Sequence, residues 1–371
     1  MSNPILPHVS LIPPYPPGRP IEDVAREFGL EPSAIVKLAS NENPLGTAPA
    51  ATEAIRQCNE KTYRYPDFHN FSLIAALAAY CGLPEDHILP GCGSSELILM
   101  IAHGFLNHER QSVYPRYSFA SYAGASKAAG SEGIACDVHA DWRPDLDALL
   151  QAGREERTKV VFLATPNNPT GALTPAADVH ALAEALPDDT LLVIDEAYRE
   201  YLDEADRPDI SRLLSSRKHI VILRTFSKIF GLAGARVGYA ITHPELLKVL
   251  QPMGMPFGVN MVGQQAAAAA LGDDEFINRS RQHNAVERVR LCDWLTKAGF
   301  EYVPSHGNFV LMKSGDGATV SRELMKRGVI IRPVGNYGLP DWIRVSVGTA
   351  EENDTFIEAL SQVSNIRTHA N

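Results

Sequence analysis

Three polar side chains of different chemistry each follow an apolar run in the middle of the chain. Asn168 lies in TPNNPTG after KVVFLA, Asp195 ends TLLVID, and Lys228 comes shortly after HIVILR. An amide, a carboxylate and an amine can together bind and polarise one small organic molecule, and a lysine amine is also a nucleophile toward carbonyl carbons. Because most lysines are solvated surface charges, a chemical role for Lys228 depends on these neighbours.

The apolar runs that precede these residues are typical of buried parallel strands. They are short, continuous and rich in Val, Ile and Leu, and ADVHALAEALP, between the first two, has helical spacing. Strands joined by helical crossovers form a parallel sheet, and ligands bind at the edge where the carboxyl ends of its strands meet. The sequence therefore predicts that Asn168, Asp195 and Lys228 converge at one sheet edge.

The combination of Asp195 and Lys228 indicates a particular cofactor. A buried carboxylate is costly unless a cation or a donor faces it, and a protonated pyridine ring would meet that need. Pyridoxal phosphate requires a lysine for its Schiff base, a carboxylate for its ring nitrogen, donors for its phenolic oxygen and an anion site for its phosphate. We therefore expect pyridoxal 5'-phosphate as the cofactor.

A candidate phosphate site lies in PGCGSSELILMIAHGF, where a glycine-serine turn opens an apolar helical run. Amides at a helix N-terminus bind phosphate through unpaired N–H groups and the helix dipole. The alternative is that Ser94 or Ser95 is an ordinary N-cap. Together with Ser227 and Arg236 of TFSKIFGLAGARVGY, the turn predicts a cup for the phosphate.

The chain resembles fold-type-I pyridoxal-phosphate aminotransferases of the aspartate aminotransferase superfamily, and the histidinol-phosphate aminotransferase family in particular. The resemblance implies an α/β fold, with a mostly parallel seven-stranded sheet flanked by helices in a large domain and a second, small α/β domain. It covers essentially the whole chain. The motifs that carry it, in the family's order, are KLASNENPLG, YRYPD, GCGSSE, PRYSF, TPNNPTG, VIDEAY, TFSKIFGLAGARVGY, GNFV and IRPVGNYGLPDWIRVSVGT.

The domain boundaries follow from a change of pattern along the chain. We expect residues 1–45 to form an N-terminal arm that joins the small domain, 46–265 the large cofactor-binding domain, and 266–371 the C-terminal small domain. The arm begins with the proline-rich MSNPILPHVSLIPPYPPGRP. QAAAAALGDDEFINRS is helical with a break at Gly272, and the strands beyond it alternate as in an antiparallel α/β domain.

The resemblance implies a role for each residue around the cofactor. Lys228 forms the Schiff base and shuttles the proton between substrate Cα and cofactor C4′, and Asp195 pairs with the pyridine nitrogen. Asn168 and Tyr198 hydrogen-bond the phenolic oxygen, and Tyr117 stacks on the ring. Judged singly, Tyr117 is more often a packing aromatic, Asn168 a turn residue and Asp195 a cap. The phosphate is held by Ser94, Ser95, Ser227 and Arg236.

The resemblance also implies a homodimer with shared active sites. The hydroxyl of Tyr65, from YRYPD, reaches the phosphate from the other subunit, although a lone tyrosine there is more often a packing residue. One departure concerns Cys92, which stands where relatives are expected to carry asparagine or alanine, and Ala235 replaces a common leucine. The first departure affects the expected detail of the phosphate loop.

Two arginines of the small domain are expected to select the substrates. Arg344 in WIRVSVGT matches the superfamily's carboxylate-binding arginine, and a guanidinium grips a carboxylate in two places. Arg332 in IIRPV matches the position expected to meet a substrate phosphate, and its alternative is a surface arginine on an edge strand. Tyr15 of the arm and Asn168 are also expected to contact substrate.

These assignments predict a pyridoxal-phosphate-dependent transaminase of histidine biosynthesis that moves an amino group between L-histidinol phosphate and 2-oxoglutarate. Imidazole acetol phosphate and glutamate are the products in the reverse of the biosynthetic direction. Alternatives within the cofactor class are an aromatic amino-acid aminotransferase and a threonine-phosphate decarboxylase. A non-catalytic alternative is a ligand sensor on the same fold. Such sensors usually carry a DNA-binding domain, whereas this sequence begins with a short proline-rich arm.

Composition limits the other function classes. The chain has 371 residues, 45% hydrophobic residues and a formal net charge of −10, without a long basic run, so we expect no nucleic-acid or membrane partner. No uninterrupted apolar run of about 18 residues occurs. The five cysteines are scattered and lack a CxxC pair, which favours a reducing cytoplasm and predicts neither a disulfide framework nor a metal site.

Overall fold

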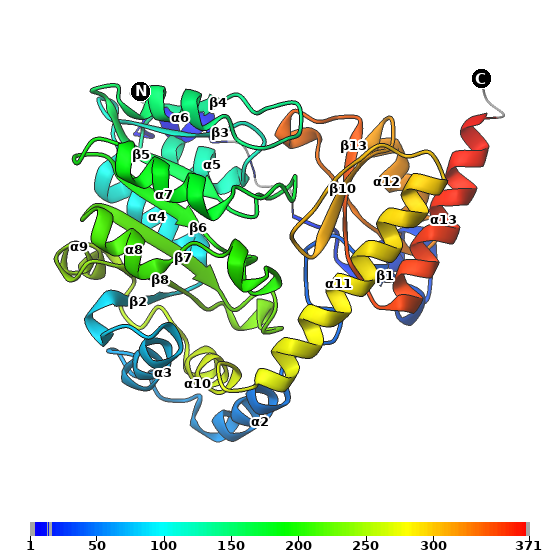
Figure 1. The fold of residues 1–371 in the computed structure, drawn as a ribbon. Coiled ribbons are helices and arrows are strands. Elements are labelled where there is room, and N and C mark those ends of the chain that lie inside the picture. Colours follow the sequence, from blue (N-terminus) through cyan, green and yellow to red (C-terminus); the bar gives the residue numbers. More distant parts are fainter. Residues whose placement is uncertain (1–3, 13, 15–16, 369–371) are drawn as a thin grey trace.

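The computed structural model describes residues 4–12, 14 and 17–368. Tyr15, expected to contact substrate, lies outside the described residues. Figure 1 shows two parts: on the left of the view, a large sheet with helices on both of its faces, and on the right, a smaller sheet with the long helix α11 running along it. This arrangement confirms the predicted fold class, an α/β protein built on a mostly parallel seven-stranded sheet.

The seven-stranded sheet has the order β2-β8-β7-β6-β5-β3-β4. Strand β8 is antiparallel to both of its neighbours, and the other neighbouring pairs are parallel. The runs that the sequence predicted as buried strands are β5, β6 and β7, three neighbours at the centre. The strands are β2 (Ile88–Gly91), β3 (Gln111–Pro115), β4 (Gly133–Cys136), β5 (Thr158–Ala164), β6 (Leu191–Asp195), β7 (Ile220–Thr225) and β8 (Gly238–Thr242).

Alternate residues of each central strand belong to two separate cores, because successive side chains point to opposite faces. Val160 and Phe162 of β5 pack with α4, α5 and α9, whereas Val161 and Leu163 pack with α2, α3, α6, α7, α8 and α10. The helices are α2 (Pro49–Cys58), α3 (Phe71–Cys81), α4 (Ser94–Phe105), α5 (Ala120–Ala128), α6 (Leu146–Gly153), α7 (Ala176–Ala185), α8 (Ile210–Ser216), α9 (Pro244–Leu250) and α10 (Met261–Ala270).

The smaller sheet has four antiparallel strands in the order β12-β13-β10-β9, covered by α11, α12 and α13. The predicted helix break at Gly272 is confirmed, since α10 ends at Ala270 and α11 begins at Asp274. These elements are α11 (Asp274–Lys297), β9 (Tyr302–Val303), β10 (Phe309–Lys313), α12 (Gly317–Met325), β12 (Arg332–Pro333), β13 (Trp342–Ser346) and α13 (Ala350–Thr368).

The N-terminal segment contacts both parts of the molecule. Strand β1 (Val36–Lys37) pairs in parallel with β11 (Val329–Ile330), and α1 (Ile21–Phe28) shares an apolar cluster with Met325 and Ile330. Further toward the N-terminus, the short 3₁₀ helix Pro7–Leu11 lies against α5 of the large sheet. The domain boundaries proposed from the sequence stay predictions. Among the described residues, no helix has the length and apolar character needed to span a bilayer.

Candidate active site

A cavity of 240 Å³ opens at the carboxyl ends of β5, β6 and β7. The predicted convergence at this edge is observed, because Asn168, Asp195 and Lys228 all line the cavity. The first turn of α4 closes one end of it. The lining residues are Ser40, Glu42, Ser94, Ser95, Phe119, Tyr122, Ala164, Pro166, Asn168, Asp195, Ala197, Tyr198, Thr225, Ser227, Lys228, Ala233 and Arg236.

Asp195 is buried at the end of β6, with 5% of its surface exposed. Its Oδ2 accepts a hydrogen bond from the Tyr122 hydroxyl at 2.8 Å, and its Oδ1 accepts one from the Ala197 amide at 3.1 Å. Loss of hydration raises the pKa of Asp195, and these two hydrogen bonds oppose that rise. Asp195 thus forms the turn cap considered as an alternative, and it also presents a carboxylate at the cavity.

Lys228 lies past the end of β7 and lines the cavity, where a hydrogen bond holds its amine in place. Nζ donates to the Ser40 carbonyl at 3.0 Å and lies 5.8 Å from the centre of the Tyr198 ring. Loss of hydration, assisted by the positive charge of Arg344, lowers the pKa of Lys228 to about 8. Part of the amine is therefore neutral near pH 7, and the neutral form is the nucleophile.

Asn168 and Tyr198 reach the cavity from the loops after β5 and β6. The Asn168 Oδ1 accepts a hydrogen bond from Arg344, and the Tyr198 hydroxyl accepts one from Asn41 Nδ2 at 2.9 Å. Loss of hydration raises the pKa of Tyr198 to about 12, so its hydroxyl stays protonated and can donate at neutral pH. The turn in NNPTG is instead closed by Asn167, whose Nδ2 donates to Thr170 Oγ1 at 2.9 Å.

The first turn of α4 is arranged as an anion site. Gly93 is the N-cap and provides no side-chain cap, so the N-cap alternative for Ser94 and Ser95 is wrong; they occupy the first helical positions. Gly93 has a φ of 78°, and a Cβ there would lie 2.7 Å from an Arg236 nitrogen. Arg236 also donates to Ser227 Oγ at 3.4 Å. The hydroxyls of Ser94, Ser95 and Ser227 and the guanidinium of Arg236 therefore line the same cavity as the first helical turn.

Arg332 and Arg344 are direct cross-strand partners on β12 and β13, and each is only 6% exposed. The surface-arginine alternative for Arg332 is therefore wrong, although β12 is the edge strand. Arg344 donates to Asn168 Oδ1 and to the Ala39 carbonyl, and its buried Nε has no partner among the described residues. An anion bound near both guanidinium groups would be attracted by both charges.

The arrangement of a strand-end lysine, a carboxylate and two buried arginines agrees with the comparison with known proteins. Residues 33–360 match the family model described as aminotransferase class I and II. The chain belongs to the class I and II aminotransferase family.

Named members of this family align with nearly the full chain. A histidinol-phosphate aminotransferase of Cupriavidus pinatubonensis is 44% identical over 359 residues, which are 96% of this chain and 95% of the relative. One of Dechloromonas aromatica is 42% identical, covering 98% and 99% of the two chains. The fold is also similar to the crystal structure of the histidinol-phosphate aminotransferase of Sinorhizobium meliloti in complex with pyridoxal-5'-phosphate, with a TM-score of 0.89. The two sequences are 31% identical, and the alignment covers 98% of both chains.

Four residues expected at the aminotransferase site are not among those that line this cavity: Tyr65, Tyr117, Arg332 and Arg344, of which Arg344 contacts the lining residue Asn168. Tyr65 is 79% exposed and stacks on Phe257 with ring centres 4.6 Å apart. Tyr117 is not among the lining residues, and its ring faces Trp142 at 5.6 Å, whereas Phe119 of the same motif does line the cavity. Their roles at the cofactor stay predictions.

The sequence reasoning missed three residues that organise the aminotransferase site. Asn41, in the quoted KLASNENPLG, is buried with a φ of 53° and donates to Tyr198; an asparagine tolerates this left-handed conformation. Asn167 holds the turn beside Asn168, and Tyr122 binds Asp195. The quoted motifs contained Asn41 and Asn167, but no spacing rule distinguished them from their neighbours, and Tyr122 lies just beyond PRYSF.

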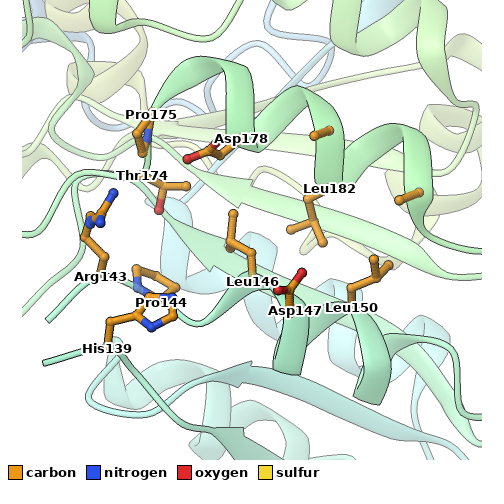
Figure 2. A pocket seen from close by; sticks show the side chains of 12 residues that line it. His139, Arg143, Pro144, Leu146, Asp147, Leu150, Thr174, Pro175, Asp178 and Leu182 are labelled. Atoms are coloured by element: carbon orange, nitrogen blue, oxygen red, sulfur yellow. The ribbon is translucent and has the colours of Figure 1, made fainter. Parts of the chain in front are cut away.

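A larger cavity, of 350 Å³, lies on the other face of the sheet between α6 and α7 (Figure 2). Leu146, Leu150 and Leu182 line it, with Arg143, Asp147 and Asp178 among the polar residues around it. Neither a lysine nor any of the predicted site residues lines it. Size alone would have pointed to this hollow, but the groups that could bond to a cofactor all lie at the smaller one.

Proposed function

We propose that this aminotransferase binds pyridoxal 5'-phosphate and transfers an amino group between L-histidinol phosphate and 2-oxoglutarate, in the cytoplasm, as a step of histidine biosynthesis. The observation that carries the proposal is the pair of buried, opposed arginines beside Asn168 of the lysine-bearing cavity. A donor with a phosphate and an acceptor with two carboxylates both need such anion sites. The names of the relatives support the same substrate.

The residues of the cavity fit the cofactor. Asp195 is a buried carboxylate whose hydrogen-bond partners among the described residues, Tyr122 and Ala197, carry no charge, so a protonated ring nitrogen would supply the missing cation. We assign Asn168 and Tyr198 to the phenolic oxygen. The phosphate belongs at the first turn of α4, with Ser94, Ser95, Ser227 and Arg236.

The chemistry divides between the cofactor and the protein. When bound, pyridoxal phosphate supplies an electron-withdrawing ring that stabilises negative charge at the substrate Cα. Lys228 would hold the cofactor through Nζ, and its free amine would take the proton from the substrate Cα. Its lowered pKa suits that role, because an amine with a pKa near 8 accepts and returns a proton near neutral pH. Asp195 keeps the ring nitrogen protonated.

The two arginines have separate tasks in this proposal. Arg344 grips the carboxylate of 2-oxoglutarate or glutamate, and its orphaned Nε is one donor for that purpose. Arg332 grips the phosphate of histidinol phosphate, which has no α-carboxylate and needs another anionic handle. Their guanidinium groups are largely shielded from water, so each contact is stronger than at the surface.

We further propose that the active form is a homodimer in which Tyr65 of one protomer completes the phosphate site of the other. The support is an exposed aromatic patch formed by Tyr65, Phe68 and Phe257, in which Phe257 contacts both Tyr65 and Phe68. Contiguous exposed apolar surface of this kind marks protein interfaces. Hybrid dimers of Lys228→Ala and Tyr65→Phe subunits should recover one sound site, and a fully active monomer in sedimentation would contradict the proposal.

A panel of amino donors tests the substrate. The purified holoenzyme is given 2-oxoglutarate with histidinol phosphate, phenylalanine, tyrosine or threonine phosphate, and glutamate formation is measured. We expect histidinol phosphate to have the highest kcat/KM. Preference for phenylalanine or tyrosine would indicate an aromatic aminotransferase, release of CO₂ from threonine phosphate a decarboxylase, and cofactor binding without any turnover a ligand sensor.

A further inference from the structure

Tyr122 is a buried tyrosine that contacts Asp195 and has no role in holding the substrate or the cofactor in the assignments above. It lies on α5, is fully buried, and stacks on Phe162 of β5 with ring centres 4.7 Å apart and an angle of 6° between the rings. Its hydroxyl points at the end of the neighbouring strand β6, where it donates to Asp195 Oδ2 at 2.8 Å. The ring is thus fixed by packing, and the hydroxyl is aimed at the carboxylate.

The hydrogen bond between Tyr122 and Asp195 links α5 to the end of β6, two elements that are not consecutive in the chain. Tyr122 and Asp195 are 73 residues apart, and the other donor to the carboxylate, the amide of Ala197, is only two residues away. The local amide can satisfy Oδ1 in any turn of this kind. Tyr122 is therefore the group through which the tertiary fold sets the direction of the Asp195 carboxylate.

We propose that Tyr122 is a positioning residue for the reaction, whose hydroxyl holds Asp195 as an oriented carboxylate for pairing with a protonated ring nitrogen. The inference rests on the proposed function, since it needs a cofactor ring at Asp195. Burial without a full charge partner favours the neutral acid, and the Tyr122 hydroxyl opposes this by donating to the charged form. The pKa of Tyr122 itself is raised well above its usual range by burial and by Asp195, so it remains a donor.

Loss of the Tyr122 hydroxyl would change the charge on the cofactor ring. Without the Tyr122 donor, Asp195 becomes more basic and competes with the ring nitrogen for the shared proton. The ring then carries less positive charge and withdraws electrons less well. Cofactor affinity and turnover should fall together, whereas substrate affinity, set by other residues, should change little.

Tyr122→Phe tests the proposal, because phenylalanine keeps the ring and its stacking on Phe162. We expect kcat to fall about 10- to 100-fold and the cofactor dissociation constant to rise about tenfold, with KM changed less than about threefold. The matched control is Tyr114→Phe: the Tyr114 ring is 6.4 Å from that of Tyr122, but its hydroxyl donates to the Gly133 carbonyl at 3.3 Å. The control should match wild type in all three quantities.

A double-mutant cycle on cofactor affinity separates positioning from packing. If Tyr122 acts through Asp195, Tyr122→Phe in an Asp195→Asn background should leave the cofactor dissociation constant unchanged within about twofold. A full effect in that background, or a Tyr122→Phe enzyme with wild-type affinity and kcat, would overturn the proposal. Failure of the wild-type protein to bind the cofactor or to transaminate would instead refute the proposed function.

Discussion

Asp195 and Glu196 are consecutive buried carboxylates on opposite faces of the sheet, and their surroundings differ. Glu196, only 1% exposed, faces α3 and receives Arg224 from β7, with both the Nε and Nη2 of Arg224 at 2.8 Å from its Oε2. Asp195 faces α5 and receives a hydroxyl and an amide. A buried charge that the protein pairs is structural, whereas one left without a counter-ion is available to a ligand.

The buried arginines also differ in the side chains that lie next to them. Arg224 is paired with Glu196 in the core, while Arg332 and Arg344 face each other across two strands. Two buried guanidinium groups at opposing positions of adjacent strands would both attract an anionic substrate.

The largest effect should come from removing the unpaired carboxylate. Asp195→Asn keeps an acceptor for Tyr122 and Ala197 but loses the charge that holds the ring nitrogen protonated. We expect kcat to fall by about 10³-fold or more, with the unfolding free energy of the cofactor-free protein changed by less than about 1 kcal/mol. Near wild-type turnover in a cofactor-saturated variant would remove Asp195 from this role.

The opposite pattern is expected at the paired carboxylate. Glu196→Gln removes the carboxylate that pairs with the buried Arg224 at 2.8 Å, so the free energy of unfolding should fall by about 3 to 5 kcal/mol in urea denaturation. The folded holoenzyme should retain kcat within about threefold. A variant that removes both charges, Glu196→Gln with Arg224→Met, should recover much of the lost stability; a turnover defect without loss of stability would break the contrast with Asp195.

The arginine pair gives the next effect in size. Arg332→Ala removes a charge-assisted contact in a shielded site and should cost about 2 to 4 kcal/mol in kcat/KM for histidinol phosphate, about two to three decades. An unphosphorylated aromatic donor should be affected much less. Arg344→Ala should instead impair the half-reaction with 2-oxoglutarate, and single-turnover absorbance changes measure each half separately. Equal losses for both donors would show that the two arginines do not divide the task.

These contrasts also show which parts of the site a sequence reader can find. The apolar runs and their strand-end residues predicted the sheet edge and the lysine, because burial of a parallel strand leaves a continuous signature in one stretch of chain. Tyr122 and Asn41 were missed because their partners, Asp195 and Tyr198, lie 73 and 157 residues away. The turn in NNPTG is closed by Asn167 and not by Asn168. Two adjacent asparagines look alike in the sequence, and only the tertiary structure distinguishes their roles.

The smallest expected effect concerns the rate at which the cofactor attaches. Burial lowers the pKa of Lys228 to about 8 in the cofactor-free protein, so the neutral fraction of its amine rises about tenfold between pH 7 and 9 and then levels off. Attachment, followed by absorbance after mixing with pyridoxal phosphate, should accelerate by that factor and reach a plateau above pH 9. A rate that keeps rising beyond pH 10 would indicate a lysine with an ordinary pKa.

The sequence by itself determined the alternation of faces and the order of the groups at the sheet edge. Consecutive residues of an extended chain point to opposite sides, and Glu196 directly follows β6 with its amide still bonded to the Leu223 carbonyl of β7, so Asp195 and Glu196 separate. Only the tertiary structure decided which of the two received Arg224, and that Arg332 would lie opposite Arg344. Those outcomes depend on packing between distant segments, where desolvation and charge act through space and leave no local pattern in the chain.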